Sequence, residues 1–167
     1  SWKSDLHNTG DIVSEQGEVR LYANQNLYNG TEEDKDGNVT AKNQIELIAY
    51  KGNLINYGNM ESQTSSVALT GGEIYETELN NNRDVVSDIT NYGSITAAEM
   101  VLLRTVNGSI NNHKQITSQN STVTIKAEQH KDYNGQMAVG DIKNGAGETF
   151  DQYADITAAK GITLDAA

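Results

Sequence analysis

The stretch of sequence that decides the fold runs from residue 91 to residue 103 and reads NYGSITAAEMVLL. An Asn-x-Gly turn is followed by an apolar anchor, Ile95, and two positions later by a small residue, Ala97. Apolar residues then return at alternate positions, Val101 and Leu103. Alternation with a period of two is typical of a β-strand that buries one face. The stretch therefore predicts two short strands separated by tight turns.

The same pattern recurs in phase along the chain. The clearest copies of the turn contain Asn8 and Gly10, Asn56 and Gly58, and Asn91 and Gly93, and weaker copies begin at Lys35, Asn112 and Gln152. Each copy leads to a second strand, whose apolar pairs are Val19/Leu21, Ile45/Leu47, Val67/Leu69, Val101/Leu103, Val123/Ile125 and Ile162/Leu164. Such a repeat predicts an all-β fold, a right-handed single-stranded parallel β-helix of about six coils. We expect asparagines at one corner of successive coils to stack as an amide ladder.

The spacing between successive anchors shows where the coils are interrupted. Met60 follows Val39 by 21 residues, and Ile116 follows Ile95 by 21, whereas the other spacings are 27, 35 and 40. The excess predicts a single β-helix over residues 1–167 with three loop inserts, near 24–36, 75–90 and 128–152. The last insert contains a short alternating stretch at residues 137–142, which is also compatible with a poorly matching coil.

Composition narrows the classes of function. The formal net charge of -11 repels phosphate backbones and anionic lipids, so we expect no binding to nucleic acid or to membrane surfaces. No apolar run is long enough to insert into a bilayer. The chain has no Cys, which excludes disulfides and thiolate chemistry, and no Pro, which suits long regular strand ladders. Because it begins at Ser1 without an initiator Met, we expect it to be a segment of a longer protein.

The repeat resembles the haemagglutinin repeats of filamentous haemagglutinin and of contact-dependent inhibition proteins, the exoproteins of two-partner secretion systems. The resemblance is closest over residues 91–112, extends over residues 8–127 and is weaker over residues 152–167. It implies secretion or display on the bacterial outer surface, as an adhesin or as the stalk that carries a toxin. It also implies an outer-membrane transporter as partner during secretion, and a cell-surface protein or glycan, of host or bacterium, as ligand. On this reading the chain is not an enzyme and needs no cofactor.

The rival hypothesis is a β-helical polysaccharide-degrading enzyme or a phage tailspike fragment. Such an enzyme needs carboxylates or basic residues that converge on one face. The carboxylates that could serve lie in the predicted inserts and are Asp84, Asp88, Asp141, Glu148 and Asp151. None recurs at a fixed strand position, and only 12 Lys and Arg residues are scattered along the chain. We therefore predict no catalytic residue.

One segment has the spacing of a calcium loop. Asp34, Asp36 and Asn38 place oxygen ligands at alternate positions around a Gly turn, as in the first half of an EF-hand loop. The position of the bidentate Glu in that motif is occupied by Ile45. An acidic turn between strands explains the same residues, and we prefer that interpretation, with calcium as the alternative. The histidines, His7, His113 and His130, share no metal-ligand spacing.

Three tyrosines share the middle slot of the Asn-x-Gly turn, namely Tyr57, Tyr92 and Tyr153. Tyr57 and Tyr92 are candidate contact residues, because exposed rings can bind sugar or protein. Since we place one or more coils between the copies, we expect packing over the turn rather than a continuous aromatic ladder. Four Asn-x-Ser/Thr sites begin at Asn29, Asn38, Asn107 and Asn120, as an Asn- and Thr-rich chain also produces by chance.

Overall fold

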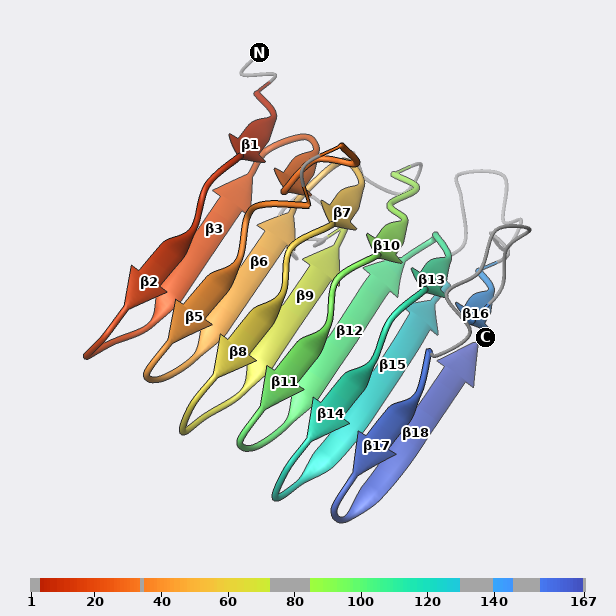
Figure 1. Ribbon diagram of the computed structural model, residues 1–167. Helices are drawn as coiled ribbons and strands as arrows, with labels where there is room; N and C mark the ends of the chain where they lie inside the picture. The colour runs from red at the N-terminus through yellow and green to blue at the C-terminus, as the bar shows by residue number, and fades with distance from the viewer. Residues whose placement is uncertain (1–3, 34, 73–84, 130–139, 146–153, 167) are drawn as a thin grey trace, which may run out of the picture.

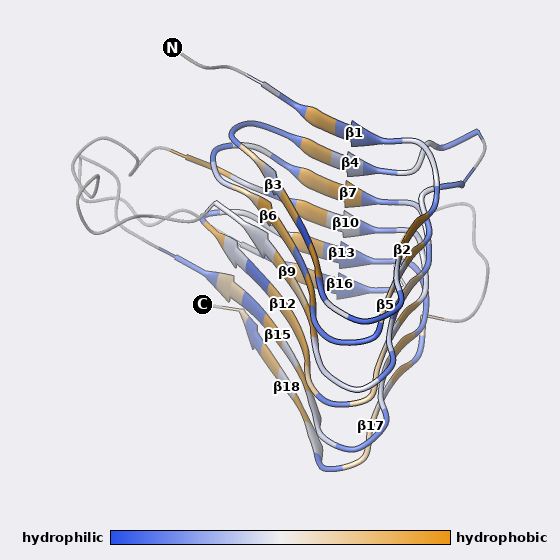
Figure 2. Ribbon diagram, turned by 90° about the vertical axis from the view of Figure 1, so that its left-hand side faces the viewer, coloured by the Kyte–Doolittle hydropathy of each residue, from blue (hydrophilic) through white to orange (hydrophobic). Residues whose placement is uncertain are grey.

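The protein is a single-stranded parallel β-helix of six coils, which confirms the fold predicted from the repeat (Figure 1). The computed structural model describes residues 4–33, 35–72, 85–129, 140–145 and 154–166, and these residues form strands and turns without a helix. Within them, no helix is long and apolar enough to cross a membrane. Each coil contributes one strand to each of three six-stranded sheets. The three sheets surround one apolar interior (Figure 2).

The three sheets are named A, B and C in the order in which a coil visits them. Sheet A contains β1 (Leu6–Asn8), β4 (Leu27–Asn29), β7 (Leu54–Asn56), β10 (Ile89–Asn91), β13 (Ile110–Asn112) and β16 (Ile142–Asn144). Sheet B contains β2 (Ile12–Ser14), β5 (Val39–Ala41), β8 (Met60–Ser62), β11 (Ile95–Ala97), β14 (Ile116–Ser118) and β17 (Ile156–Ala158). Sheet C contains β3 (Val19–Ala23), β6 (Ile45–Ala49), β9 (Val67–Gly71), β12 (Val101–Val106), β15 (Thr122–Glu128) and β18 (Gly161–Ala166).

Strict register between coils builds the core. In sheet B, Ile95 is paired with Met60 on one side and with Ile116 on the other, and all three are at most 1% exposed. The apolar pairs predicted in sheet C also align, so that Val101 and Leu103 lie between Val67/Leu69 and Val123/Ile125. Like side chains therefore stack on like side chains along the axis, and each coil buries its apolar face against its neighbours.

A ladder of asparagine side chains, buried over its four central members, runs the full length of the β-helix at the end of sheet A. Each Nδ2 donates to Oδ1 of the next asparagine, over distances of 2.7 to 2.8 Å, from Asn8 through Asn29, Asn56, Asn91 and Asn112 to Asn144. The four central members are at most 1% exposed. This arrangement confirms the predicted amide ladder. It also satisfies side-chain groups that would otherwise be costly to bury.

Two further columns of side chains cap the backbone of the next coil. Just before sheet A, Oδ1 of Asn26 accepts from the Asn53 backbone N–H, at 2.9 Å, and Oδ1 of Asn53 accepts from that of Asp88, also at 2.9 Å. Just before sheet B, Oδ1 of Asn38 accepts from the Asn59 N–H at 3.0 Å. These columns explain why the chain is rich in Asn, since one short amide can bridge two adjacent coils.

The inserts lie close to their predicted positions, but their bounds differ. The first insert occupies residues 30–38, because the predicted range 24–36 contains β4. The second lies between β9 and β10, so its end is Asp88 rather than residue 90. The third is divided by β16 into residues 129–141 and 145–155. β4 lies inside the first predicted insert, and β16 begins at Ile142, the last residue of the alternating stretch at residues 137–142 that is also compatible with a coil.

A glycine in the left-handed region marks the start of three of the inserts. Gly30, Gly72 and Gly145 follow directly on strands and have φ angles of 85°, 73° and 77°. Residues with a Cβ rarely adopt this conformation, so the chain changes direction there at little steric cost. The first insert also separates the ladder residue from the glycine of the turn. The ladder residue of that coil is therefore Asn29, and in the last coil it is Asn144. Neither lies in the weaker copies of the turn motif, which begin at Lys35 and Gln152.

Replacement of Asn91 by Ala should destabilise the protein by about 2–4 kcal/mol, because it leaves buried partners without hydrogen bonds. Asn91 Nδ2 donates to Oδ1 of Asn112 and to the Gly93 carbonyl, and its own Oδ1 accepts from Asn56. The matched control is Asn120→Ala at an exposed turn, which should change stability by less than about 0.5 kcal/mol. Urea unfolding followed by circular dichroism measures both, and equal effects would contradict the ladder's role.

Gly93→Ala should cost about 1–3 kcal/mol, because an added Cβ would overlap the backbone carbonyl of Gly58 in the previous coil. Gly10→Ala is the control, because a Cβ added at Gly10 would have no atom within 4 Å. The two glycines share the same place in the turn motif, so the comparison isolates the close approach of neighbouring coils. Thermal melting of both variants is the measurement, and a neutral Gly93→Ala would show that the coils are not packed this closely.

Candidate functional site

A continuous stack of three rings lies beside the amide ladder. Tyr57 and Tyr92 are parallel to within 8°, with ring centroids 4.9 Å apart, and His113 continues the stack on Tyr92 at 4.6 Å. The expectation that no continuous aromatic ladder would form is therefore wrong. The three residues belong to consecutive coils, because the second insert lengthens the sequence between Tyr57 and Tyr92 without adding a coil. Tyr153 lies outside the described residues.

The stack is positioned by the same register as the core. Each ring belongs to the residue that directly follows a ladder asparagine. The backbone N–H of that residue donates to the backbone carbonyl of the ladder asparagine in the previous coil. These bonds join Tyr57 to Asn29, Tyr92 to Asn56 and His113 to Asn91, at 2.7 to 2.8 Å. The spacing of parallel strands, about 4.8 Å, is close to the spacing at which aromatic rings stack.

A second ring pair lies on the outer face of sheet A. His7 and Tyr28 are the middle residues of β1 and β4, and their rings are stacked at 4.6 Å with 9° between the planes. The repeat pattern did not reveal this pair, because β4 was assigned to an insert. Once Leu6 and Leu27 are aligned as inward residues, the outward positions of His7 and Tyr28 follow.

The geometry limits how the tyrosines can contact a ligand. Tyr57 and His113 cover the two faces of Tyr92, so no sugar ring can stack on that side chain. Tyr92 is nevertheless 37% exposed, and its outer edge is the part of the ring that a partner can reach. The predicted contact role of Tyr57 and Tyr92 thus stays a prediction, and for Tyr92 it is limited to contact with the edge of the ring.

Burial shifts the pKa of two groups in the stack, Tyr57 and His113. Burial raises the pKa of the Tyr57 hydroxyl above its ordinary value, and the nearby Tyr92 and Glu32 contribute in the same direction. Burial also lowers the pKa of the His113 imidazole, so the stack favours the neutral ring. Burial therefore favours the uncharged form of both the Tyr57 hydroxyl and the His113 imidazole.

The candidate calcium ligands are only partly described. Asp34 lies outside the described residues, and Asp36 is exposed. The amide of Asn38 has other partners, since its Oδ1 accepts from the Asn59 N–H and its Nδ2 donates to Asp11 at 3.0 Å. Among the described residues, no group of three or more His, Asp or Glu side chains is placed to hold a metal ion.

Of the carboxylates considered for catalysis, Asp84, Glu148 and Asp151 lie outside the described residues. Asp88 and Asp141 precede β10 and β16 in the column that enters sheet A, with Ser109 between them. Asp88 Oδ1 accepts from the Ser109 backbone N–H at 2.7 Å, and Asp141 pairs with Lys143 at 3.9 Å. Two coils, or about 10 Å, separate the two carboxylates along the axis. The hydrogen bond of Asp88 and the ion pair of Asp141 give each carboxylate a structural role.

The four Asn-x-Ser/Thr sites differ in exposure. Asn29 and Asn107 are buried, and the amide of Asn38 is hydrogen-bonded within a column, whereas Asn120 is exposed at the turn after β14. Of the other two histidines, His7 is stacked on Tyr28 and His130 lies outside the described residues.

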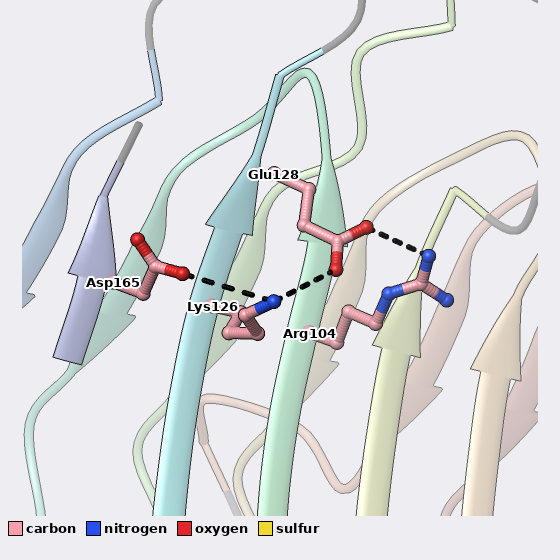
Figure 3. A network of polar contacts seen from close by, with 4 residues as sticks. All are labelled: Arg104, Lys126, Glu128 and Asp165. Atoms are coloured by element: carbon pink, nitrogen blue, oxygen red, sulfur yellow. Dashed lines mark hydrogen bonds and ion pairs between the residues drawn. The ribbon is translucent and has the colours of Figure 1, made fainter. Parts of the chain in front are cut away.

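A network of charges crosses three coils on the outer face of sheet C (Figure 3). The Glu128 carboxylate accepts from Arg104 at 2.7 Å and lies 3.5 Å from Lys126, which in turn lies 3.7 Å from Asp165. The Arg104 hydrogen bond is the main reason that the pKa of Glu128 falls below its ordinary value. Opposite charges in neighbouring coils thus support the register from outside.

Comparisons with models of protein families, with curated proteins and with solved structures give no match.

Tyr92→Ala should lower stability by about 1–3 kcal/mol, because it removes two ring–ring contacts, whereas Tyr92→Phe should cost less than about 0.5 kcal/mol because the ring stays. Urea unfolding of both variants is the measurement. If both variants lose the same stability, the hydroxyl rather than the stack is important.

Glu128→Gln should destabilise the protein at neutral pH by up to about 1 kcal/mol, a modest effect because these side chains are partly exposed. The folded pKa lies below the ordinary 4.5, so this contribution is present above that pH and is lost as the pH falls through the folded pKa. The difference between wild type and variant should therefore shrink in acid. Glu61→Gln, on the outer face of sheet B, is the control, and a pH-independent difference would contradict the assignment.

Proposed function

We propose that this chain is a segment of the extracellular β-helical shaft of a secreted bacterial adhesin or contact-dependent growth-inhibition effector. The observation that carries the proposal is the unbroken register of all three six-stranded sheets, which continues past every insert. Six coils joined in this way form a rod about 30 Å long, and each coil rests only on its neighbours. Such a structure supplies reach and rigidity without a catalytic residue.

The placement of the inserts supports a second part of this role, the presentation of binding regions. Inserts leave the rod at two of its three edges, between sheets A and B after Gly30 and Gly145, and between sheets C and A after β9 and β15. The third edge carries only short turns, from four residues between Ser14 and Val19 to two between Ala158 and Gly161 (Figure 2). Binding to a cell-surface protein or glycan would thus occur along the A–B and C–A edges, whereas the B–C edge carries no insert among the described residues.

Secretion and the outer-membrane transporter partner are proposed from the resemblance to two-partner secretion exoproteins. The fold is compatible with export as an unfolded chain, because every coil uses the previous one as its template. Within the described residues, strands β1 to β18 all pair with strands of adjacent coils only. Folding could therefore proceed coil by coil as the chain emerges.

The test separates the rod from its inserts. In one variant, residues 30–37 are replaced by the dipeptide Tyr-Gly, which restores the tight turn found at residues 57–58. In a second variant, residues 145–154 are replaced in the same way. Both should keep the strand-dominated circular dichroism and the melting temperature of the parent, because the register does not depend on the inserts.

Binding of the fluorescently labelled protein to bacterial and epithelial cells is then compared among the parent, the two trimmed variants and Asn120→Ala as a folded control. The proposal expects the parent and the control to bind and at least one trimmed variant to lose binding. Absence of binding by the parent would contradict a binding role. Release of reducing sugars from polysaccharides by the parent would instead support the rival β-helical enzyme.

A further inference from the structure

Tyr57 and Tyr92 form an unusual pair of phenols. Among the described residues, they are the tyrosines that stack face to face, with centroids 4.9 Å apart and planes 8° apart. The other described tyrosine pair, Tyr22 and Tyr50, is more distant, at 6.2 Å, and tilted by 53°. The two pairs therefore provide an internal comparison between a parallel and a tilted arrangement.

The fold restrains Tyr92 against Tyr57 through two contacts. The backbone N–H of Tyr92 donates to the Asn56 carbonyl at 2.7 Å, which fixes it one strand spacing from Tyr57. His113 covers the far face of Tyr92 at 4.6 Å, so that ring cannot swing away from Tyr57 toward the next coil. At 37% exposure, the edge of Tyr92 is still accessible to a soluble oxidant.

We propose that Tyr57 and Tyr92 are a site of oxidative cross-linking, at which a haem peroxidase and hydrogen peroxide form a dityrosine bond between the third and fourth coils. This inference is independent of the proposed function. The fold supplies what the reaction otherwise lacks, since two phenoxyl radicals are held in contact instead of having to meet by diffusion.

The reaction is balanced as follows. Each tyrosine loses one electron and its phenolic proton to give a neutral phenoxyl radical, and the two radicals join through ring carbons ortho to the oxygens. The hydrogens on those carbons then return to the oxygens as the rings regain aromaticity. In total the pair loses two electrons and two protons, and hydrogen peroxide takes them up as it is reduced to two water molecules.

The bond would have a defined structural consequence. It would connect positions 57 and 92 around the second insert, which lies between β9 and β10. The third and fourth coils would then stay joined even when the hydrogen bonds between them open. The cross-linked protein should accordingly unfold at a higher urea concentration than the untreated protein, because the bond restricts the unfolded chain.

The experiment treats the dilute full chain with a haem peroxidase and hydrogen peroxide. We expect a monomeric product with dityrosine fluorescence, a mass lower by two hydrogens, and one dominant pair of linked peptides that contain Tyr57 and Tyr92. Tyr92→Phe keeps the stacked ring but has no phenol, so the fluorescence should fall by about fivefold or more. Tyr22→Phe removes one member of the tilted pair and should leave the yield unchanged.

Circular dichroism of both variants checks that the fold is intact before oxidation. The proposal would be overturned if the main product joined separate chains, if the mapped link used another tyrosine, or if Tyr92→Phe gave the wild-type yield.

Discussion

The structure depends on one constraint, the need of buried asparagine side chains to find partners in the coils above and below. A carboxamide inside the protein is costly unless its donor and acceptor are both used. In the ladder from Asn8 to Asn144, the observed alignment of successive coils meets this condition, because each Nδ2 donates to Oδ1 of the next asparagine. A shift of one residue would also turn the apolar side chains outward, so the polar and apolar requirements specify the same register. The core, the close glycine contacts and the ring stack all follow from it.

The residue after each ladder asparagine determines what the surface of that coil presents. Tyr57, Tyr92 and His113 occupy this position where the chain turns directly into sheet B, and their rings stack. Gly30 and Gly145 occupy it where the chain leaves the rod, with φ angles of 85° and 77°. The sheets of the rod therefore keep their register wherever an insert interrupts a coil. The inserts can differ in length and chemistry without any change in the register that supports them.

Much of this architecture could be predicted from the sequence, because apolar alternation and the Asn-x-Gly turn report on local physical requirements. The sheet C pairs and the ladder roles of Asn56 and Asn91 are examples. Asn29 and Asn144 were missed because an insert separates each from the rest of its turn motif. The ring stack was missed because adjacency in space depends on the number of coils, and not on the number of residues, between Tyr57 and Tyr92. Asp34 and the second insert's carboxylate Asp84 lie outside the described residues.

The most direct test of the ladder is the exchange of asparagine side-chain amide protons with deuterated solvent, followed by nuclear magnetic resonance. If Asn29, Asn56, Asn91 and Asn112 donate to one another inside the helix, their Nδ2 protons should exchange as slowly as the backbone amides of sheet A. The exposed Asn120 should exchange orders of magnitude faster, because it needs no opening of the structure. Fast exchange at all five residues would contradict the buried amide ladder and the register that is built on it.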